Sequence, residues 1–190
     1  MKGFLKRALG LLGRPANRGA AAVEIALYSV VLLPLLGNTV DLGMLIYTHF
    51  QLDAVVAAGA QYAVVNAANA NSSGGAGLAG SIAALVANGR SSSWASSTVV
   101  VNNGPTASVT SGSASSGGTA SSADGYYCPT GTPGRWSWGS AVAAGTSCGT
   151  NLTAGKFVTV SGTHTYTSIA PGISVVTTGP ITQSVIVQVQ

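Results

Sequence analysis

The sequence RGAAAVEIALYSVVLLPLLGNTVDLGMLIY, residues 18–47, decides how this chain is organised. A basic residue and a glycine are followed by small apolar residues, by a single acid, Glu24, and then by a long hydrophobic run. The 26 residues from 22 to 47 would form a helix of roughly 39 Å, enough to cross a hydrocarbon core of roughly 30 Å with some tilt. The sequence therefore predicts a transmembrane helix at residues 20–47, kinked at Pro34 because proline cannot donate a backbone hydrogen bond.

The charged residues are few and unevenly placed. Only 6% of the residues are charged, against roughly 25% in an ordinary soluble domain. Basic residues without any acid precede the apolar run, which predicts a cytoplasmic N-terminus and places the rest of the chain outside the cytoplasm. No basic patch remains elsewhere to neutralise phosphates, so the charge distribution argues against nucleic-acid binding. The basic residues of this first segment are Lys2, Lys6, Arg7, Arg14 and Arg18.

The helical period continues beyond the apolar run, through residues 48–70. Small and apolar side chains recur there at three- and four-residue spacing, which predicts that one long helix extends out of the membrane. The composition of residues 71–77 predicts a break, and residues 78–88 are expected to form a short second helix capped by Gly89. The repeating residues of the first segment are Leu52, Val55, Val56, Ala60, Ala63 and Val64.

The remainder of the chain has a strand-like pattern. An Asn103-Gly104-Pro105 turn signal separates two short strand candidates, and the C-terminal part alternates apolar and polar residues. The Ser/Gly/Ala run at residues 113–124 has no apolar period and is expected to form a mobile loop. The predicted strands are residues 97–102, 107–111, 156–168, 173–178 and 181–189. The fold prediction is α+β: the long N-terminal helix packs on a small antiparallel β-rich head, residues 71–190, with one short helix.

The two cysteines, Cys128 and Cys148, lie in the part predicted to be outside the cytoplasm, where oxidation is permitted. A bridge between them would stabilise the fold by roughly 3 kcal/mol, because closing the loop lowers the conformational entropy of the unfolded chain. An aromatic cluster lies in or beside this loop, and it has two interpretations: a face that binds a sugar or a protein, or the core filling of a small head. Its members are Tyr126, Tyr127, Trp136 and Trp138.

Two acids interrupt the apolar run. An acid in a lipid-embedded helix costs about 1–3 kcal/mol even with snorkelling, so it commonly marks a function or a partner. If the chain is cleaved after Gly19, the new amine of Ala20 on one subunit could pair with Glu24 on the next; the alternative is an interfacial acid exposed to headgroups. Asp41 is expected either to pair with a partner helix or to mark the outer interface.

The sequence offers no constellation for catalysis or for a cofactor. His49 and His164 stand far apart without spaced carboxylates or cysteines, so no metal site can be assembled. There is no G-x-S-x-G elbow and no phosphate-binding glycine loop. We therefore expect a structural or binding protein rather than an enzyme.

Residues 18–64 carry a specific resemblance. Gly19 followed by AAAVEI resembles the processing site of type IV prepilin-like proteins. The downstream residues LPLLGNTVDLG, Tyr47, Gln51-Leu52 and GAQYAV are similar to the TadE-like pseudopilins of the tight-adherence (Flp) pilus system. The chain departs from that family at Met44 and Gln61, where arginine is common.

This resemblance implies a processing pathway and partners. Residues 1–19 would be a basic leader that a prepilin peptidase of the bacterial inner membrane removes between Gly19 and Ala20. The mature chain would be a minor pseudopilin with a periplasmic head that assembles or primes a pilus for adhesion. Its partners would be the peptidase, other pseudopilins and the pilin, the inner-membrane assembly platform and the lipid bilayer. The alternative is an uncleaved single-span protein whose head recognises a glycan or an envelope partner.

Overall fold

The computed structural model describes residues 16–149, 152–169, 172 and 174–190. Most of the predicted leader, residues 1–15, lies outside this part of the chain. The residues fall into two compact units. The first comprises Met1–Met44 and Ser168–Thr177, and the second comprises Leu45–Thr167 and Thr178–Gln190.

One long helix, α2, runs over Ala16–Val65 and is followed by the 3-10 helix η1 at Ala67–Asn69. The helix contains Pro34 without ending there. Its part from Gly19 onward is long and apolar enough to cross a membrane, and no residue of its most hydrophobic window is buried. A single N-terminal apolar helix of this kind indicates a membrane-anchored protein.

Polar side chains in the apolar part of α2 bond to the backbone one turn earlier. Ser29 Oγ donates to the Ile25 carbonyl at 2.7 Å, and Thr39 Oγ1 donates to the Leu35 carbonyl at 2.8 Å. Asn38 Nδ2 donates to the Pro34 carbonyl at 2.7 Å. Such back-bonding satisfies the donors inside the helix itself.

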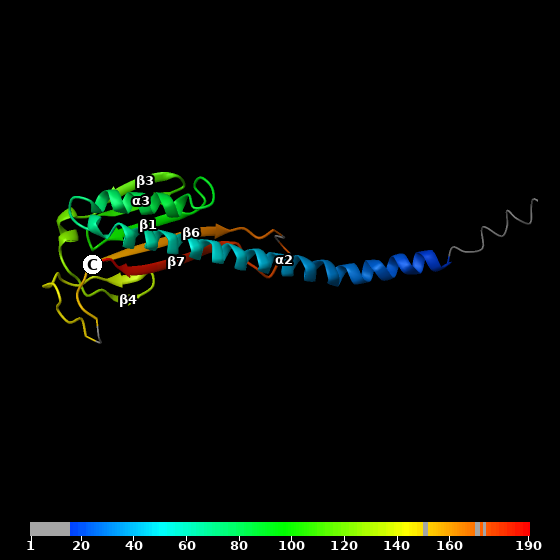
Figure 1. Cartoon of the computed structure of the whole chain (residues 1–190). Helices are drawn as coiled ribbons and strands as arrows, with labels where there is room; N and C mark the ends of the chain where they lie inside the picture. The colour runs from blue at the N-terminus through cyan, green and yellow to red at the C-terminus, as the bar shows by residue number, and fades with distance from the viewer. Residues whose placement is uncertain (1–15, 150–151, 170–171, 173) are drawn as a thin grey trace, which may run out of the picture. The chain divides into compact units, whose positions relative to one another are not determined.

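The second unit contains a five-stranded antiparallel sheet in the order β3-β2-β1-β6-β7 (Figure 1). The strands are β1 Ser96–Val101, β2 Thr106–Thr110, β3 Ser113–Gly117, β6 Phe157–Tyr166 and β7 Gly179–Gln188. Two short strands, β4 Thr130–Thr132 and β5 Arg135–Ser137, form a separate hairpin. The remaining elements are the helix α3 at Gly75–Ala87 and the 3-10 helix η2 at Ala120–Asp124.

One face of the sheet packs against helices because alternate residues of its central strands are apolar and buried. Val99 and Val101 of β1 and Val158 and Val160 of β6 have no exposed surface. Helix α3 lies against β1 and β2 and contributes Leu78, Ile82 and Val86 to this core. The α+β prediction is confirmed by the long apolar helix, the antiparallel sheet and a short α-helix, α3, among the described residues.

The part of α2 in the second unit approaches β6 at two glycines. A Cβ on Gly162 would lie 3.0–3.2 Å from side-chain carbons of Leu52, Val56 and Val86, and one on Gly59 would lie 2.9 Å from Val86. These separations leave no room for another carbon, so each glycine permits the close contact. The predicted buried face of this helix is correct at five of its six positions; Val64 is 45% exposed.

Three local predictions were wrong. Residues 113–124 form β3 and η2 rather than a loop: every residue of β3 is exposed, and this edge strand is held by pairing with β2 and by a Ser108–Ser115 hydroxyl contact of 2.8 Å. The second helix begins at Gly75 and is capped by Asn88, whose N–H donates to the Ala84 carbonyl, not by Gly89. The described residues of 173–178 are not a strand, because backbone and side-chain groups there bond to α2 instead.

The turn between β1 and β2 is fixed by a buried asparagine. Asn102 has no exposed surface and adopts a left-handed backbone with φ of 48°. Its Nδ2 donates to the carbonyls of Ala123 at 2.8 Å and Gly125 at 2.6 Å, and its Oδ1 accepts from the Phe157 N–H at 3.2 Å. One side chain therefore joins the turn to η2 and to the start of β6.

Candidate functional site

The expected processing site lies at the start of the apolar helix. Gly19, Ala20 and Glu24 are all exposed residues of α2. Around Glu24 the large apolar side chains are also exposed, with Val23 at 61% and Ile25 at 67%. An exposed apolar surface of this length requires lipid or neighbouring helices to cover it.

Asp41 has a different environment within the same unit. Its side chain is fully buried, and the Ser168 Oγ and the Ile169 N–H donate to it at 2.5 and 3.1 Å. The Ser174 hydroxyl donates to the same carboxylate, and one turn earlier Asn38 Oδ1 accepts from the Val175 N–H. The described residues Ser168, Ile169, Ser174 and Val175 thus bond to the polar face that Asn38 and Asp41 share. Several donors around a buried carboxylate offset the cost of its desolvation.

The predicted disulfide is present in the second unit. Cys128 and Cys148 are bonded with their Cα atoms 5.4 Å apart. The closed loop contains the β4–β5 hairpin, and isolated bridges pair Tyr126 with Val142 and Tyr127 with Gly155. The disulfide closes the loop, and the bridges of Tyr126 with Val142 and of Ser147 with Thr153 attach it to the rest of the unit.

The four aromatic residues do not form one core cluster. Tyr127 is buried and its hydroxyl donates to the Ser122 carbonyl at 2.9 Å. Trp138 is half-buried and meets the Tyr127 ring edge-on, with the ring centroids 6.0 Å apart. Tyr126 lies 5.9 Å from the ammonium of Lys156, a largely buried cation that donates to the Ala70 carbonyl at 3.0 Å.

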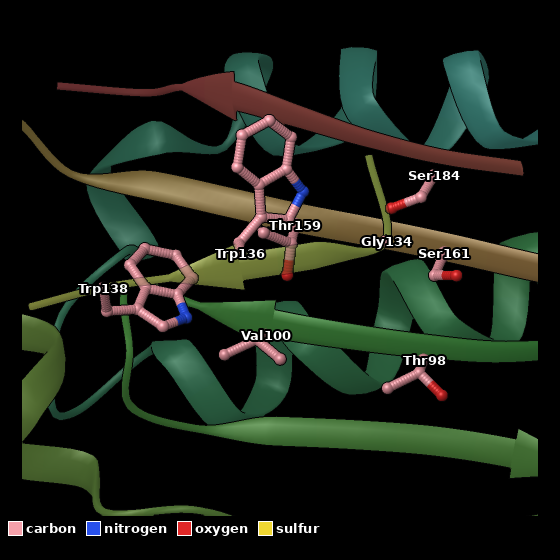
Figure 2. A pocket seen from close by; sticks show the side chains of 8 residues that line it. All are labelled: Thr98, Val100, Gly134, Trp136, Trp138, Thr159, Ser161 and Ser184. Atoms are coloured by element: carbon pink, nitrogen blue, oxygen red, sulfur yellow. The ribbon is translucent and has the colours of Figure 1, made fainter. Parts of the chain in front are cut away.

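Trp136 and Trp138 line a pocket on the sheet face opposite α3 (Figure 2). The cavity has a volume of about 260 Å³. Figure 2 shows both indoles grouped with the hydroxyl side chains of β1, β6 and β7, with helices behind the sheet. The lining residues are Thr98, Val100, Gly134, Trp136, Trp138, Thr159, Ser161 and Ser184. Tyr127 therefore belongs to the core of this unit, whereas Trp136 and Trp138 border a cavity.

The histidines contribute to local packing. His164 stacks on Trp94, with ring centroids 4.5 Å apart, and its Nδ1 lies 2.6 Å from the Trp94 carbonyl. His49 lies within hydrogen-bond distance of Gln183. Across residues 16–149, 152–169, 172 and 174–190, no three His, Cys, Asp or Glu side chains come together in a way that could hold a metal ion.

Comparison with protein families gives a match to the N-terminal segment. A family model described as TadE-like protein matches residues 19–61. This segment is TadE-like. A comparison with curated proteins gave no significant match, and neither did a comparison with solved structures.

The TadE-like segment contains Gly19, Ala20, Glu24, Pro34 and Asp41, the residues singled out in the N-terminal part of the sequence. The match makes this segment similar to a family of proteins associated with the Tad pilus. The pocket and the disulfide loop lie beyond the matched residues.

Some functional candidates could not be found from the sequence. Ser168 and Ser174 belong to a stretch rich in hydroxyl residues, and nothing in its pattern connects them to Asp41. The hydroxyl side chains beneath the tryptophans likewise come from three strands that are separated in sequence. Only the alternation of valine with hydroxyl residues from Val158 to Ser161 in β6 indicated that one sheet face is polar.

Proposed function

We propose that this chain is a minor pseudopilin, cleaved by a prepilin peptidase between Gly19 and Ala20, that assembles or primes a Tad-type pilus. Two observations support the proposal together. The TadE-like match begins at Gly19 itself. The helix that follows exposes its apolar side chains almost throughout its first half, as a helix built to be covered by lipid or by other helices would.

Glu24 has a specific role in this proposal. After cleavage, Ala20 carries a positive α-amino group, and Glu24 lies four residues farther along the helix. At 1.5 Å per residue the two groups are separated by about 6 Å along the axis. A neighbouring subunit shifted by that distance brings its amine to this carboxylate, and an ion pair in lipid is strongly preferred to a lone charge. The pair would thus set the stagger between packed helices.

The remaining parts of the proposal concern location. Residues 20–47 span the inner membrane with the N-terminus in the cytoplasm, residues 48–70 continue the helix into the periplasm, and residues 71–190 form the periplasmic head. The cluster of basic residues before Gly19 supports this orientation through the positive-inside rule.

The deciding experiment is the intact mass and N-terminal sequence of the membrane-extracted protein, made with and without the prepilin peptidase. A start at Ala20 only when the peptidase is present supports the proposal, and Gly19→Lys should abolish that product. A start at Met1 under both conditions would refute processing and leave an uncleaved anchored protein as the alternative.

A further inference from the structure

The outer face of the sheet carries a continuous row of hydroxyl side chains. The strand register pairs Thr98 of β1 with Ser108 of β2 on one side and with Ser161 of β6 on the other. Ser108 pairs in turn with Ser115 of β3, and Ser161 with Ser184 of β7. All five strands thus place a serine or threonine in the same row, and none of these residues is buried. This face is polar but uncharged.

Two tryptophans border this face at the pocket shown in Figure 2. Trp136 belongs to β5, and Trp138 follows directly after that strand. Both lie inside the loop closed by Cys128 and Cys148. The pocket therefore combines hydroxyl groups from the sheet with aromatic rings from a covalently closed loop, and the edge contact of Trp138 with Tyr127 supports its ring.

The indole of Trp136 contains a buried donor without an acceptor. Its Nε1 is inaccessible to solvent and has no hydrogen-bond partner among the described residues. An indole nitrogen can only donate, and leaving such a donor unpaired is costly, so native proteins rarely retain one without a reason. A ligand that turned this indole toward the adjoining cavity would supply the acceptor with one of its oxygens.

The pocket restricts what that ligand can be. None of its eight lining residues carries an ionisable side chain, so nothing in the lining would compensate a charged ligand. Its volume of about 260 Å³ is smaller than the roughly 300–1,000 Å³ of sites for larger ligands, which favours a single ring. Aromatic surfaces bind the C–H face of a sugar ring, and hydroxyl side chains exchange hydrogen bonds with its edge.

We propose that this pocket binds one unit of an uncharged saccharide, with Trp136 donating to a sugar oxygen and Trp138 contacting the ring. The site goes beyond the proposed role in pilus assembly and gives the head a ligand of its own.

The test uses the full-length protein in nanodiscs, because maltoside and glucoside detergents would compete for the site. Intrinsic tryptophan fluorescence is titrated with the methyl glycosides of glucose, galactose and N-acetylglucosamine, and with glucuronic acid as the charged comparison. We expect saturable binding of at least one neutral glycoside, with affinity at least about tenfold above that for glucuronic acid. No saturable signal from any neutral glycoside at about 10 mM overturns the proposal.

Two variants and a control separate binding from packing. Trp136→Phe keeps the ring but removes the donor, and it should weaken binding about tenfold without lowering thermal stability, because it also removes an unpaired buried group. Trp138→Ala should weaken binding by at least the same factor. Trp94→Phe, which changes a tryptophan outside the pocket, should leave binding unchanged.

Two outcomes would overturn the saccharide assignment. If Trp136→Phe destabilises the protein and leaves glycoside binding intact, the indole is a packing residue and the assignment fails. Tight binding of a proline-rich peptide that methyl glycosides do not displace would also overturn it, in favour of a protein ligand.

Discussion

Replacing Asn102 tests whether a single buried side chain holds the head together. Asn102 and Asn103 are consecutive, and both have left-handed backbones, with φ of 48° and 55°. Only the side chain of Asn102 is fully buried and bonded to three backbone groups. Alanine at either position meets the same backbone strain, so the difference between the two variants isolates the hydrogen bonds.

The magnitude follows from those contacts. Alanine in the left-handed region costs about 1 kcal/mol at either position. Three lost hydrogen bonds contribute about 1 kcal/mol each, so Asn102→Ala should cost about 4 kcal/mol and Asn103→Ala about 1 kcal/mol. For a chain of this size, the difference of about 3 kcal/mol corresponds to about 6–12 °C in Tm.

Thermal unfolding of the full-length variants in nanodiscs, followed by near-UV circular dichroism, measures this difference. Asn102→Asp is a useful third variant, because a carboxylate accepts from the Phe157 N–H but cannot donate to the carbonyls of Ala123 and Gly125. Equal Tm losses for Asn102→Ala and Asn103→Ala would refute the reasoning and assign the whole effect to the backbone.

Four further perturbations have defined outcomes. Gly59→Ala should destabilise the head by about 1–2 kcal/mol, because overpacking against Val86 outweighs the gain in helix propensity. Gly80→Ala has open space around it and should stabilise by about 0.5–1 kcal/mol. Shifts of the two denaturation midpoints in the same direction from wild type would contradict this. Hydrogen bonds from the Ser72 side chain and backbone hold the pKa of Asp124 below its ordinary 3.8. The ionised form is therefore favoured in the folded state, so the stability advantage of wild type over Asp124→Asn should be full above pH 3.8 and disappear as the pH falls through the lowered pKa; a Tm difference independent of pH would argue against it. Asp41→Ala should make residues 168–177 more sensitive to limited proteolysis, and the matched change at the exposed Asp53 should not; equal cleavage would refute the role of the carboxylate. Glu24→Ala should preserve cleavage after Gly19 but reduce pilus assembly, and normal piliation would exclude the proposed amine–carboxylate pair.

The fold was predictable where one side of an element is apolar and the other is not. Leu52, Val56 and Ala63 repeat at helical spacing and are buried as that spacing requires. The strands β1, β6 and β7 were located to within one or two residues, because they are rich in valine, isoleucine and threonine, which favour strands. The helical period predicts burial in α2 because burial along a helix on a core is itself periodic.

Prediction failed where an element forms without burying side chains. The five residues of β3 are all exposed, so no apolar alternation could reveal the strand; its backbone pairing with β2 is what defines it. The environment of Asp41 was hidden for a related reason. Its partners Ser168 and Ser174 lie more than 120 positions away, and hydroxyl residues have no spacing that identifies a distant carboxylate.

For the pocket, sequence reasoning named both tryptophans but not the sheet residues beneath them. Thr98, Ser161 and Ser184 come together only through the register of three strands. Shifting one of these strands by a single residue would replace its hydroxyl residue there by a neighbour, which in one direction is Val99, Val160 or Val185.

The back-bonded side chains of α2 also bear on how this helix could change surroundings. A subunit that leaves the bilayer for a filament exchanges contacts with acyl chains for contacts with protein, and every polar group on its surface must be re-solvated during the transfer. The donors of Ser29, Asn38 and Thr39 carry their acceptors with them, because those acceptors are carbonyls of the same helix. The exchange would therefore be nearly neutral for them, and in the proposed function the barrier to extraction would fall chiefly on Glu24, an exposed acid near the N-terminal end of the apolar run.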